Sequence, residues 1–458
     1  RFSRSSRTTS ARHWLGRGGL TLDPIEIAAA SVIALVVLIY AGAHVAFVLA
    51  LVSFVSISAM INIDFATKLV GLAAFETINN YVYGTVPLFV LMGLLISVSD
   101  VGRDTFEVAN IFFRRVKGGL GIATVAANTV FAAIMGVSIA SAAIFTKIAV
   151  PEMLRFGYKP RFAVGVVAGS SIIGMLIPPS LLLILFGILT ETSIGSLFIA
   201  GILPGIALAL AFSIAIILMA RYFPRFIGDL VPITEGDVQK PETPTTLSVK
   251  ILPIIVIVGV VFGGLYGGVF TPTEAGAVGA FGALILALIK RKLSWKILWK
   301  VLVETGHTTA AIGFLIISAS MYARLLTLSR LPQVAVDWLS TWGLGLNGTL
   351  AIYVAVVLAM GTILDALSIM LILLPFVVPI MIGFDVNLIW FGIITIIAGE
   401  MGSITPPLGL VVYVVKSTLD DNRITLGDIF AGSFPFVVIM LLVLILVISV
   451  PWLALGLL

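Results

Sequence analysis

The stretch GSSIIGMLIPPS (residues 169–180) decides how this chain folds, together with its partner GEMGSITPPLG (399–409). Each stretch places two consecutive prolines inside a long apolar run. Adjacent prolines remove two amide donors and obstruct the preceding helical turn, so we expect a helix to break at each stretch. A helix broken at membrane depth is tolerated only where its backbone faces protein or a watery cavity. The two stretches therefore predict two interrupted membrane helices.

The composition around these stretches is that of a membrane protein. Of the 458 residues, 60% are hydrophobic and 11% are charged, whereas a soluble domain is about 25% charged. Lipid must therefore be the solvent for most of the chain. At about 20 residues for each crossing, the chain has room for roughly ten to thirteen crossings or half-crossings. The fold class we expect is an all-α integral membrane protein in the lipid bilayer.

The charged and metal-binding residues exclude several classes of protein. The net charge is +5, but the basic residues lie in short connections between apolar runs, which is typical of membrane topology and not of a nucleic-acid surface. The chain has no cysteine and only three histidines, far apart, which argues against disulfides and a metal cluster. It also lacks the phosphate-binding loop of a nucleotide-driven pump.

Two polar segments frame the apolar sequence. Residues 1–24 form a basic tail with five arginines, which predicts a cytoplasmic N-terminus; the alternative is a basic tail with no further role. Residues 223–249, rich in Pro, Thr and acidic side chains, form a polar linker near the midpoint. We therefore expect a first membrane repeat at 25–222 and a second at 250–458.

The two halves share a spacing of landmarks. Pro151 precedes the pair Pro178–Pro179 by 27 residues, and Pro379 precedes Pro406–Pro407 by the same 27. One offset of 228 residues relates these positions, and it also relates Gly174 to Gly402. The repetition predicts an internal duplication. The sequence leaves open whether the second copy is inverted.

Polar residues in the interrupted stretches are candidate ion ligands. Hydroxyls and freed carbonyls are the hard oxygen ligands that alkali cations prefer, and a matched pair of interrupted segments indicates the binding site of a transporter. The alternative is a pair of kinked packing helices. The hydroxyl residues of the two stretches are Ser170, Ser171, Ser180, Ser403 and Thr405.

Charged residues inside apolar runs add further candidates. Asp365 predicts an ion or proton path, or else a structural residue at a helix break. Ser138 and Ser141 lie in the corresponding stretch of the first half, where small residues also suit helix packing. Glu400 either neutralises a cation, accepts a proton or lies at an aqueous mouth. Arg324 is a candidate counter-charge for an anionic substrate, unless it snorkels from a helix end.

Several stretches together resemble one known family. They include VPLFVLMG (86–93), KGGLGIA (117–123), GYKPRFAVGVVAGSSIIGMLIPPS (157–180), AGILPG (200–205), TPTEAGAVGA (271–280), the span around Asp365, and GSITPPLG (402–409). These residues are similar to the large membrane subunit, of the DctM type, of TRAP (tripartite ATP-independent periplasmic) transporters.

The resemblance implies a fold and a set of partners. It implies an elevator-type transporter with transport and scaffold domains, built from two inverted repeats. Each repeat would carry a helical hairpin tipped by a double proline, near 162–190 and near 387–416. It further implies symport of a small organic acid, such as a carboxylate, with sodium ions across a bacterial or archaeal inner membrane. The implied partners are a small TRAP membrane subunit and an extracytoplasmic solute-binding protein, with no enzymatic activity and no nucleic acid.

The resemblance also implies site residues. The position of Ser141 is acidic in some relatives, so the ligand there differs in this chain. The expected sodium ligands are Ser138, Ser141, Ser170, Ser171, Gly174, Asp365, Gly399, Gly402, Ser403 and Thr405. The expected substrate contacts are Ser180, Arg324, Pro178, Pro179, Pro406 and Pro407.

Two other functions fit the residues. One is a self-sufficient ion-coupled anion transporter, which would work without partner proteins. The other is an intramembrane enzyme or lipid-handling protein that uses Asp365 and Glu400 as acid–base groups.

Overall fold

The protein is described by a computed structural model that covers residues 23–228 and 244–458, except 342, 420 and 422. Over these residues the fold is helical, with one isolated bridge between Tyr158 and Gly228 and no strand. The all-α fold expected from the sequence is confirmed. The tail 1–22 and most of the linker, 229–243, lie outside the described residues.

From residue 23 to residue 228, the first half contains eleven α-helices and two short 3-10 helices. Their bounds are α1 Pro24–Tyr40, α2 Val45–Met60, α3 Ile63–Asn79, η1 Tyr81–Gly84, α4 Thr85–Val98, α5 Val101–Phe113, α6 Gly119–Met135, α7 Ser138–Arg155, α8 Pro160–Ser171, η2 Ile172–Met175, α9 Leu181–Thr190, α10 Ile194–Tyr222 and α11 Pro224–Ile227.

The second half, where described, contains ten α-helices. Their bounds are α12 Pro244–Tyr266, α13 Pro272–Ile289, α14 Trp295–Ser329, α15 Leu331–Thr341, α16 Leu346–Gly361, α17 Ala366–Gly383, α18 Leu388–Gly402, α19 Leu410–Thr418, α20 Leu426–Ser449 and α21 Trp452–Leu455.

Local sequence explains where several of these helices begin. Capping boxes, in which a side chain and the third helical residue exchange hydrogen bonds, start α1 at Asp23, α13 at Thr271 and α20 at Thr425. Proline occupies the first helical position of α1 and α13, where its missing amide costs nothing. Six helices in the described part of the chain are long and apolar enough to cross a membrane, counting η1 and α4 as one.

The first double proline interrupts a helix that crosses the molecule. At the start of α8, Tyr158 bridges Gly228 and the Lys159 amide donates to the Ile227 carbonyl at 2.7 Å, just beyond the end of α10. Only three residues separate the end of α9 from the start of α10, so these two points lie close together. Because α10 has 29 residues, the start of α8 and the end of α9 lie about 43 Å apart. The segment α8–η2–α9 therefore crosses instead of turning back.

The second double proline also interrupts a crossing helix. Trp390, at the start of α18, donates from Nε1 to the Val447 carbonyl near the end of α20, at 2.8 Å. Seven residues separate the end of α19 from the start of α20. Since α20 has 24 residues, it separates these two places by about 36 Å.

The two crossing segments run in opposite directions. The helices α8 and α20 are parallel, because Arg161 pairs with Asp428 and Gly165 and Gly169 then meet Gly432 and Phe436 in the same order. The segment α18–α19 begins where α20 ends, so it runs against α8–α9. The helix starts keep the spacing found in the sequence: α7 and α17 begin 228 residues apart (366 − 138), as do α8 and α18 (388 − 160).

The helical hairpins lie elsewhere than the sequence analysis placed them. The expectation of hairpins near 162–190 and 387–416 is wrong, since a double proline breaks a helix without fixing whether the chain reverses. The structure instead has one hairpin in α6–α7, which turns at residues 136–137, and one in α16–α17, which turns at residues 362–365. The α6–α7 hairpin opens at the end of the molecule where α8 begins, since Gly118 lies against Ile216 of α10.

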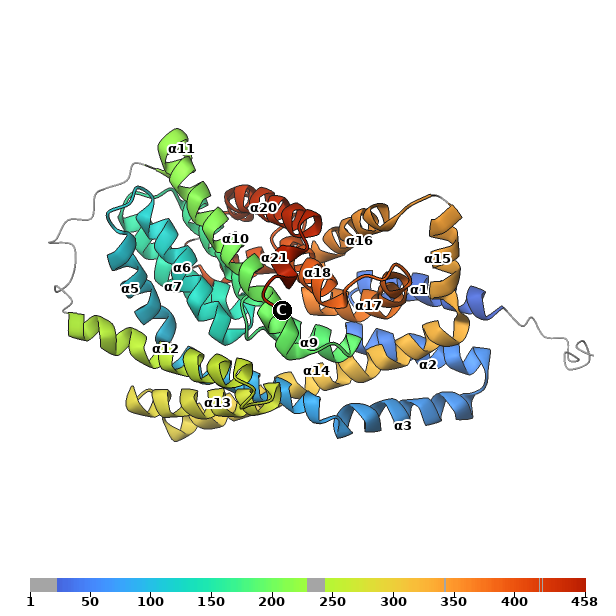
Figure 1. Cartoon of the computed structure of the whole chain (residues 1–458). Helices are drawn as coiled ribbons and strands as arrows, with labels where there is room; N and C mark the ends of the chain where they lie inside the picture. Colours follow the sequence, from blue (N-terminus) through green and yellow to red (C-terminus); the bar gives the residue numbers. More distant parts are fainter. Residues whose placement is uncertain (1–22, 229–243, 342, 420, 422) are drawn as a thin grey trace, which may run out of the picture.

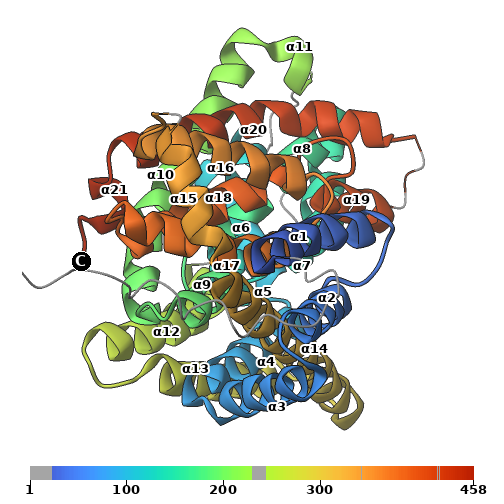
Figure 2. The same ribbon diagram turned by 90° about the vertical axis from the view of Figure 1, so that its right-hand side faces the viewer.

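A second layer of helices lies on one side of the molecule. Both views place α3, α13 and α14 together on one side of the molecule, and α16 and α20 on the other (Figures 1 and 2). Large apolar side chains are exposed along α1, α10, α12 and α20, as expected of helices in contact with lipid. Of the interrupted helices, α8 is buried from Phe162 to Ser171 and α18 from Trp390 to Gly402.

The contact between α8 and α20 yields a stability prediction. A Cβ at Gly432 would lie 1.9 Å from the Arg161 carbonyl oxygen, whereas one at Gly427 would meet only Thr425 Oγ1, at 3.6 Å. Both glycines lie in α20 and gain similar helix propensity as alanine. We expect Gly432→Ala to lose about 1 to 3 kcal/mol through overpacking and to lower the melting temperature of the purified protein. Equal melting temperatures for Gly432→Ala and Gly427→Ala would contradict this contact.

Candidate functional site

Both double prolines lie in non-helical backbone. After α8 the chain makes the 3-10 turn η2, and α9 starts only at Leu181, with Ser180 Oγ accepting from the Leu183 amide at 3.4 Å. After α18 the chain leaves the helix at Gly402 and resumes at Leu410. The Pro178–Pro179 and Pro406–Pro407 peptide bonds are both cis. The two predicted interruptions are confirmed.

Each interruption meets the tip of a hairpin from the same half. The Leu181 amide donates to the Gly136 carbonyl at 3.4 Å, and the Gly409 amide donates to the Thr362 carbonyl at 2.9 Å. Gly136 has a φ of +63°, and a Cβ there would lie 2.9 Å from the Pro179 carbonyl oxygen. Only glycine fits this close approach. Each half thus forms one junction between a hairpin tip and an interrupted helix.

A small cavity lies where the two junctions meet. Its volume is about 130 Å³, below the roughly 300 Å³ at which pockets for organic ligands begin. It suits an ion with a few water molecules better than an organic acid. Its polar lining combines Ser138 of the first half with Asp365, Glu400 and Ser403 of the second, and its apolar lining is Val137, Ile139, Met175, Leu181, Leu182, Ala366, Leu367, Leu410 and Val411.

Glu400 gives this cavity its electrostatic character. The residue is 3% exposed, and the Ser138 side chain hydrogen-bonds its carboxyl. Among the described residues, its Oε2 atom has no hydrogen-bond partner, and Asp365 is close enough to repel it. A buried, unpartnered carboxylate oxygen is costly unless a positive group satisfies it. The cavity therefore has the chemistry of a cation site.

Asp365 is partly committed to its own helix. As the N-cap of α17 it accepts from the Ser368 amide at 3.2 Å and from the Ser368 hydroxyl at 2.5 Å. A cap of this kind leaves lone pairs on both carboxylate oxygens. The other candidate ligands of this half are close by: Ser403 donates to the Glu400 carbonyl at 2.6 Å, and Gly399 packs against Ala366.

Asn128 links the polar residues of the first half, and the sequence analysis missed it. Its Nδ2 donates to Ser170 Oγ at 2.8 Å, and its Oδ1 accepts from Ser141 Oγ. All three side chains are fully buried, and they come from α8, α6 and α7. A lone amide in the apolar run of 119–135 was the signal that could have revealed it. Ser138 and Ser141, one helical turn apart, therefore serve two different polar clusters.

Four further candidates lie outside the cavity, and two of them hydrogen-bond to the preceding turn of their own segments. Ser171 donates to the Ala168 carbonyl at 2.9 Å and Thr405 to the Met401 carbonyl at 2.7 Å. Gly402 lies against the tip of the second hairpin, where its Cβ would be 2.5 Å from Gly361 Cα. Gly174 belongs to η2. These residues shape the interruptions and lie outside the lining of the cavity.

The candidate substrate residues do not form one group. Pro178, Pro179 and Ser180 are buried, whereas Pro406 and Pro407 are exposed. Arg324 lies in α14 and pairs with Glu76 of α3, so the structure gives it a partner within the other layer. It does not line the cavity.

Described residues offer no group of three or more His, Asp or Glu side chains for a metal ion. Transition metals favour such sets, while alkali cations are held by hydroxyl, carbonyl and single carboxylate oxygens. The polar lining of the cavity is of the second kind.

Comparisons with known proteins agree in their result. Residues 32–453 match the family profile described as "Tripartite ATP-independent periplasmic transporter, DctM component". The C4-dicarboxylate TRAP transporter large permease protein DctM of Pseudomonas aeruginosa is 33% identical over 393 residues, which cover 86% of this chain and 90% of that protein. The sialic acid TRAP transporter large permease protein SiaM of Vibrio cholerae is 29% identical, with 90% and 94% covered.

Solved structures resemble the fold at lower sequence identity. The antimetabolite efflux pump MtrF of Neisseria gonorrhoeae aligns with a TM-score of 0.62 and 11% identity, over 94% of this chain and 96% of MtrF. The YdaH transporter of Alcanivorax borkumensis aligns with a TM-score of 0.55 and 13% identity, over 83% and 88%. Both similarities concern the arrangement of helices alone.

Proposed function

Because the chain belongs to the DctM family of tripartite ATP-independent periplasmic transporters, we propose that it imports a small organic anion together with sodium ions. It is a multi-pass membrane protein and a transporter subunit of a TRAP system. The observation that carries the proposal is the cavity in which Ser138 of one half meets Asp365 and Glu400 of the other. Sodium, the substrate class and the motion are the parts that we propose.

Two cation sites would make ion binding depend on how the hairpins and interrupted helices are arranged. The first is the cavity, where the unpartnered Glu400 oxygen supplies negative charge beside Asp365 and Ser403. The second is the cluster that Asn128 builds from Ser141 and Ser170. In the second site Ser141 donates its proton to Asn128, so its lone pairs remain free to bind a cation. Both sites use oxygens that only come together when hairpin and interrupted helix meet.

The substrate would be a small acid that binds beside the second interruption. The relatives are named for C4-dicarboxylate, sialic acid and isethionate, and these solutes share a negative charge and high solubility. Within the described part of the chain, the cavity of about 130 Å³ is lined by the carboxylates of Asp365 and Glu400 and by no basic side chain, so it disfavours an anion. Pro406 and Pro407 are exposed, and irregular backbone at membrane depth faces water or protein, not lipid. The exposed tip is therefore the best-placed surface for the anion.

The two layers of helices suggest how the solute would cross. The transport body would comprise both hairpins and both interrupted helices, from α6 to α10 and from α16 to α20. The scaffold would be the layer with α3, α13 and α14 (Figure 2). A small TRAP membrane subunit would bind the scaffold, and an extracytoplasmic solute-binding protein would deliver the anion, in the inner membrane.

Reconstitution tests the function directly. We expect proteoliposomes that contain this chain and its small subunit to accumulate a radiolabelled acid only with the solute-binding protein and an inward sodium gradient. The acid would be chosen by screening C4-dicarboxylates, sialic acid and isethionate for thermal stabilisation of the binding protein. Uptake by this chain alone would support the self-sufficient transporter instead.

A charge variant belongs to the same experiment. Asp365→Asn retains a capping side chain but removes the charge, so it should abolish sodium-dependent uptake. Asp385→Asn is the matched control, because Asp385 lies in the α17–α18 connection with a φ of +54° that asparagine tolerates. Sodium-dependent uptake that persists in the Asp365→Asn variant would contradict sodium binding in the cavity.

A second prediction concerns Asn128. Asn128→Ala leaves Ser141 and Ser170 without their shared partner, so we expect the sodium concentration for half-maximal uptake to rise about tenfold, the effect of losing roughly 1.4 kcal/mol of hydrogen bonding. Tyr353→Phe is the control. It removes the 2.9 Å hydrogen bond between Tyr353 and Thr395, which joins α16 to α18 as Asn128 joins α6 to α8. An equal sodium dependence of uptake in both variants would contradict a role of Asn128 in sodium binding and leave it a role in packing.

The charges at the two ends of the bundle give the orientation. The end where α8 begins and α10 ends, which we call the basic end, carries Lys117, Lys159, Arg225 and Arg423 in its connections. At the opposite end, residues 191–193 and 384–387 contain no lysine or arginine. On the positive-inside rule we propose that the basic end faces the cytoplasm. The start of α1 lies at the opposite end (Figure 1), so this orientation does not agree with the cytoplasmic N-terminus expected from the five arginines of the tail.

Single cysteines test this orientation, since the chain has none. Ser193→Cys, at the opposite end, should react with a membrane-impermeant maleimide in intact spheroplasts. Lys117→Cys, at the basic end, should react only after permeabilisation, and the reverse pattern would invert the assignment. Both side chains are exposed.

A further inference from the structure

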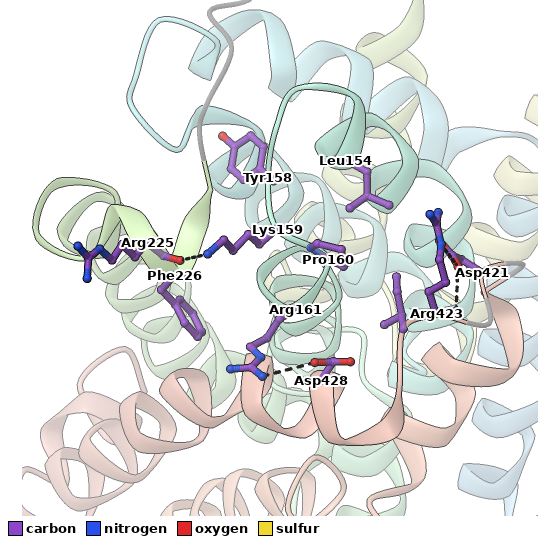
Figure 3. A pocket seen from close by; sticks show the side chains of 11 residues that line it. Leu154, Tyr158, Lys159, Pro160, Arg161, Arg225, Phe226, Asp421, Arg423 and Asp428 are labelled. Carbon is purple, nitrogen blue, oxygen red and sulfur yellow. Dashed lines mark hydrogen bonds and ion pairs between the residues drawn. The ribbon is translucent and has the colours of Figure 1, made fainter.

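A large cavity at the basic end has no part in the proposed transport chemistry. Its volume is about 790 Å³, and it lies among the α7–α8 connection, the end of α10 with α11, and the α19–α20 connection (Figure 3). It thus joins both halves of the chain. Its lining consists of Leu154, Tyr158, Lys159, Pro160, Arg161, Arg225, Phe226, Asp421, Arg423, Ile424 and Asp428.

The lining is cationic, with four basic side chains against two carboxylates (4 − 2 = +2). Hydrogen bonding by Arg423 lowers the pKa of Asp421 to about 2, so this carboxylate is charged at neutral pH. Asp428 accepts hydrogen bonds from Thr425 and Arg161, as an ionised carboxylate does. The lining therefore keeps an excess of positive charge with both carboxylates ionised.

The partners of these carboxylates show which cations are available. Asp421 holds Arg423 at 2.8 Å. The carboxylate of Asp428 belongs to the capping box of α20, where it accepts from Thr425 Oγ1 at 2.7 Å. Its distance to Arg161 is longer, 3.4 Å. Exposed pairs of this kind are weak. Arg161 is therefore free to exchange partners.

Lys159 and Arg225 complete the cationic side. Lys159 Nζ donates to the Arg225 carbonyl at 2.5 Å, which fixes the ammonium beside the cavity while two of its hydrogens remain. The Arg225 guanidinium points away from the other labelled side chains, toward the outside (Figure 3). The cations that can meet at one anion are therefore Arg161 and Lys159, while the Arg225 guanidinium lies at the outer edge of the cavity.

The position and the apolar walls indicate the partner. Leu154, Tyr158, Phe226 and Ile424 give the cavity apolar surface. Tyr222 and Phe223, just before α11, are each 65% exposed, as aromatic side chains are at the boundary between hydrocarbon and headgroups. Basic pockets between membrane helices on the cytoplasmic side bind acidic lipid headgroups.

We propose that this cavity binds the phosphate of an acidic phospholipid, held by Arg161 and Lys159 with the charge of Arg225 at its outer edge, and with the lipid chains along the apolar wall. A free inorganic anion would satisfy the charges but would leave that wall unfilled. The lipid would fasten α8 and α10 of the first half to α20 of the second at the cytoplasmic boundary. The proposal is independent of sodium and of the transported solute.

The experiment measures stabilisation by defined lipids. Purified full-length protein in a neutral detergent is titrated with phosphatidylglycerol, phosphatidylcholine or inorganic phosphate, and the melting temperature is recorded. We expect phosphatidylglycerol to raise it saturably, since a ligand of the native state stabilises it, and the other two to leave it unchanged. Equal stabilisation by phosphate would make the cavity a free-anion site and overturn the lipid assignment.

Variants locate the effect. Arg161→Gln with Arg225→Gln should raise the phosphatidylglycerol concentration for half-maximal stabilisation by roughly tenfold or more, since each basic residue near an acidic headgroup contributes on the order of 1 kcal/mol. Arg225→Gln alone, a change at an exposed side chain, should give a smaller rise in the same direction. Arg221→Gln is the control, because Arg221 lies one turn earlier in α10 and outside the lining. Equal responses of the control and the double variant would overturn the proposal.

Discussion

The structure depends on one constraint: a backbone polar group at membrane depth needs a partner inside the protein. The double prolines withdraw four amides from two crossing helices and leave non-helical backbone behind. Each break also leaves amides at the start of the next helix without an acceptor in the preceding turn, and the hairpin tips accept from two of them: the Gly136 carbonyl from the Leu181 amide, and the Thr362 carbonyl from the Gly409 amide. Interruption and hairpin must therefore occur together, once in each half, and their two junctions bring oxygen atoms to the centre of the molecule.

The same constraint explains why charge is found there. A carboxylate in an apolar bundle is costly, and Glu400 is buried with one oxygen unpartnered among the described residues. Its hydrogen bond comes from Ser138, across the boundary between the halves. A cation in this position would contact both halves at once. Its binding would therefore stabilise the arrangement of the whole transport body and not of one junction alone.

Sequence reasoning found the interruptions because proline has a defined effect on backbone hydrogen bonds, and it found Asp365 because charge in lipid is rare. It misplaced the hairpins, because proline does not encode the direction in which the chain continues; the long helices α10 and α20 settle that. Asn128 was missed since a single amide in an apolar run carries little weight by itself. The partner of Arg324 could not be foreseen, because Glu76 is 248 residues away.

The two junctions are covered differently. Gly201 and Gly205 let α10 lie directly on Leu176 and Ile177, so the first interruption is roofed by a 29-residue helix. The second has no such roof at Pro406 and Pro407, which are exposed. Water can therefore reach the prolines of the second interruption directly, whereas α10 covers the first. Ions arriving from solvent would then fill the two halves in a fixed order, the second half before the first.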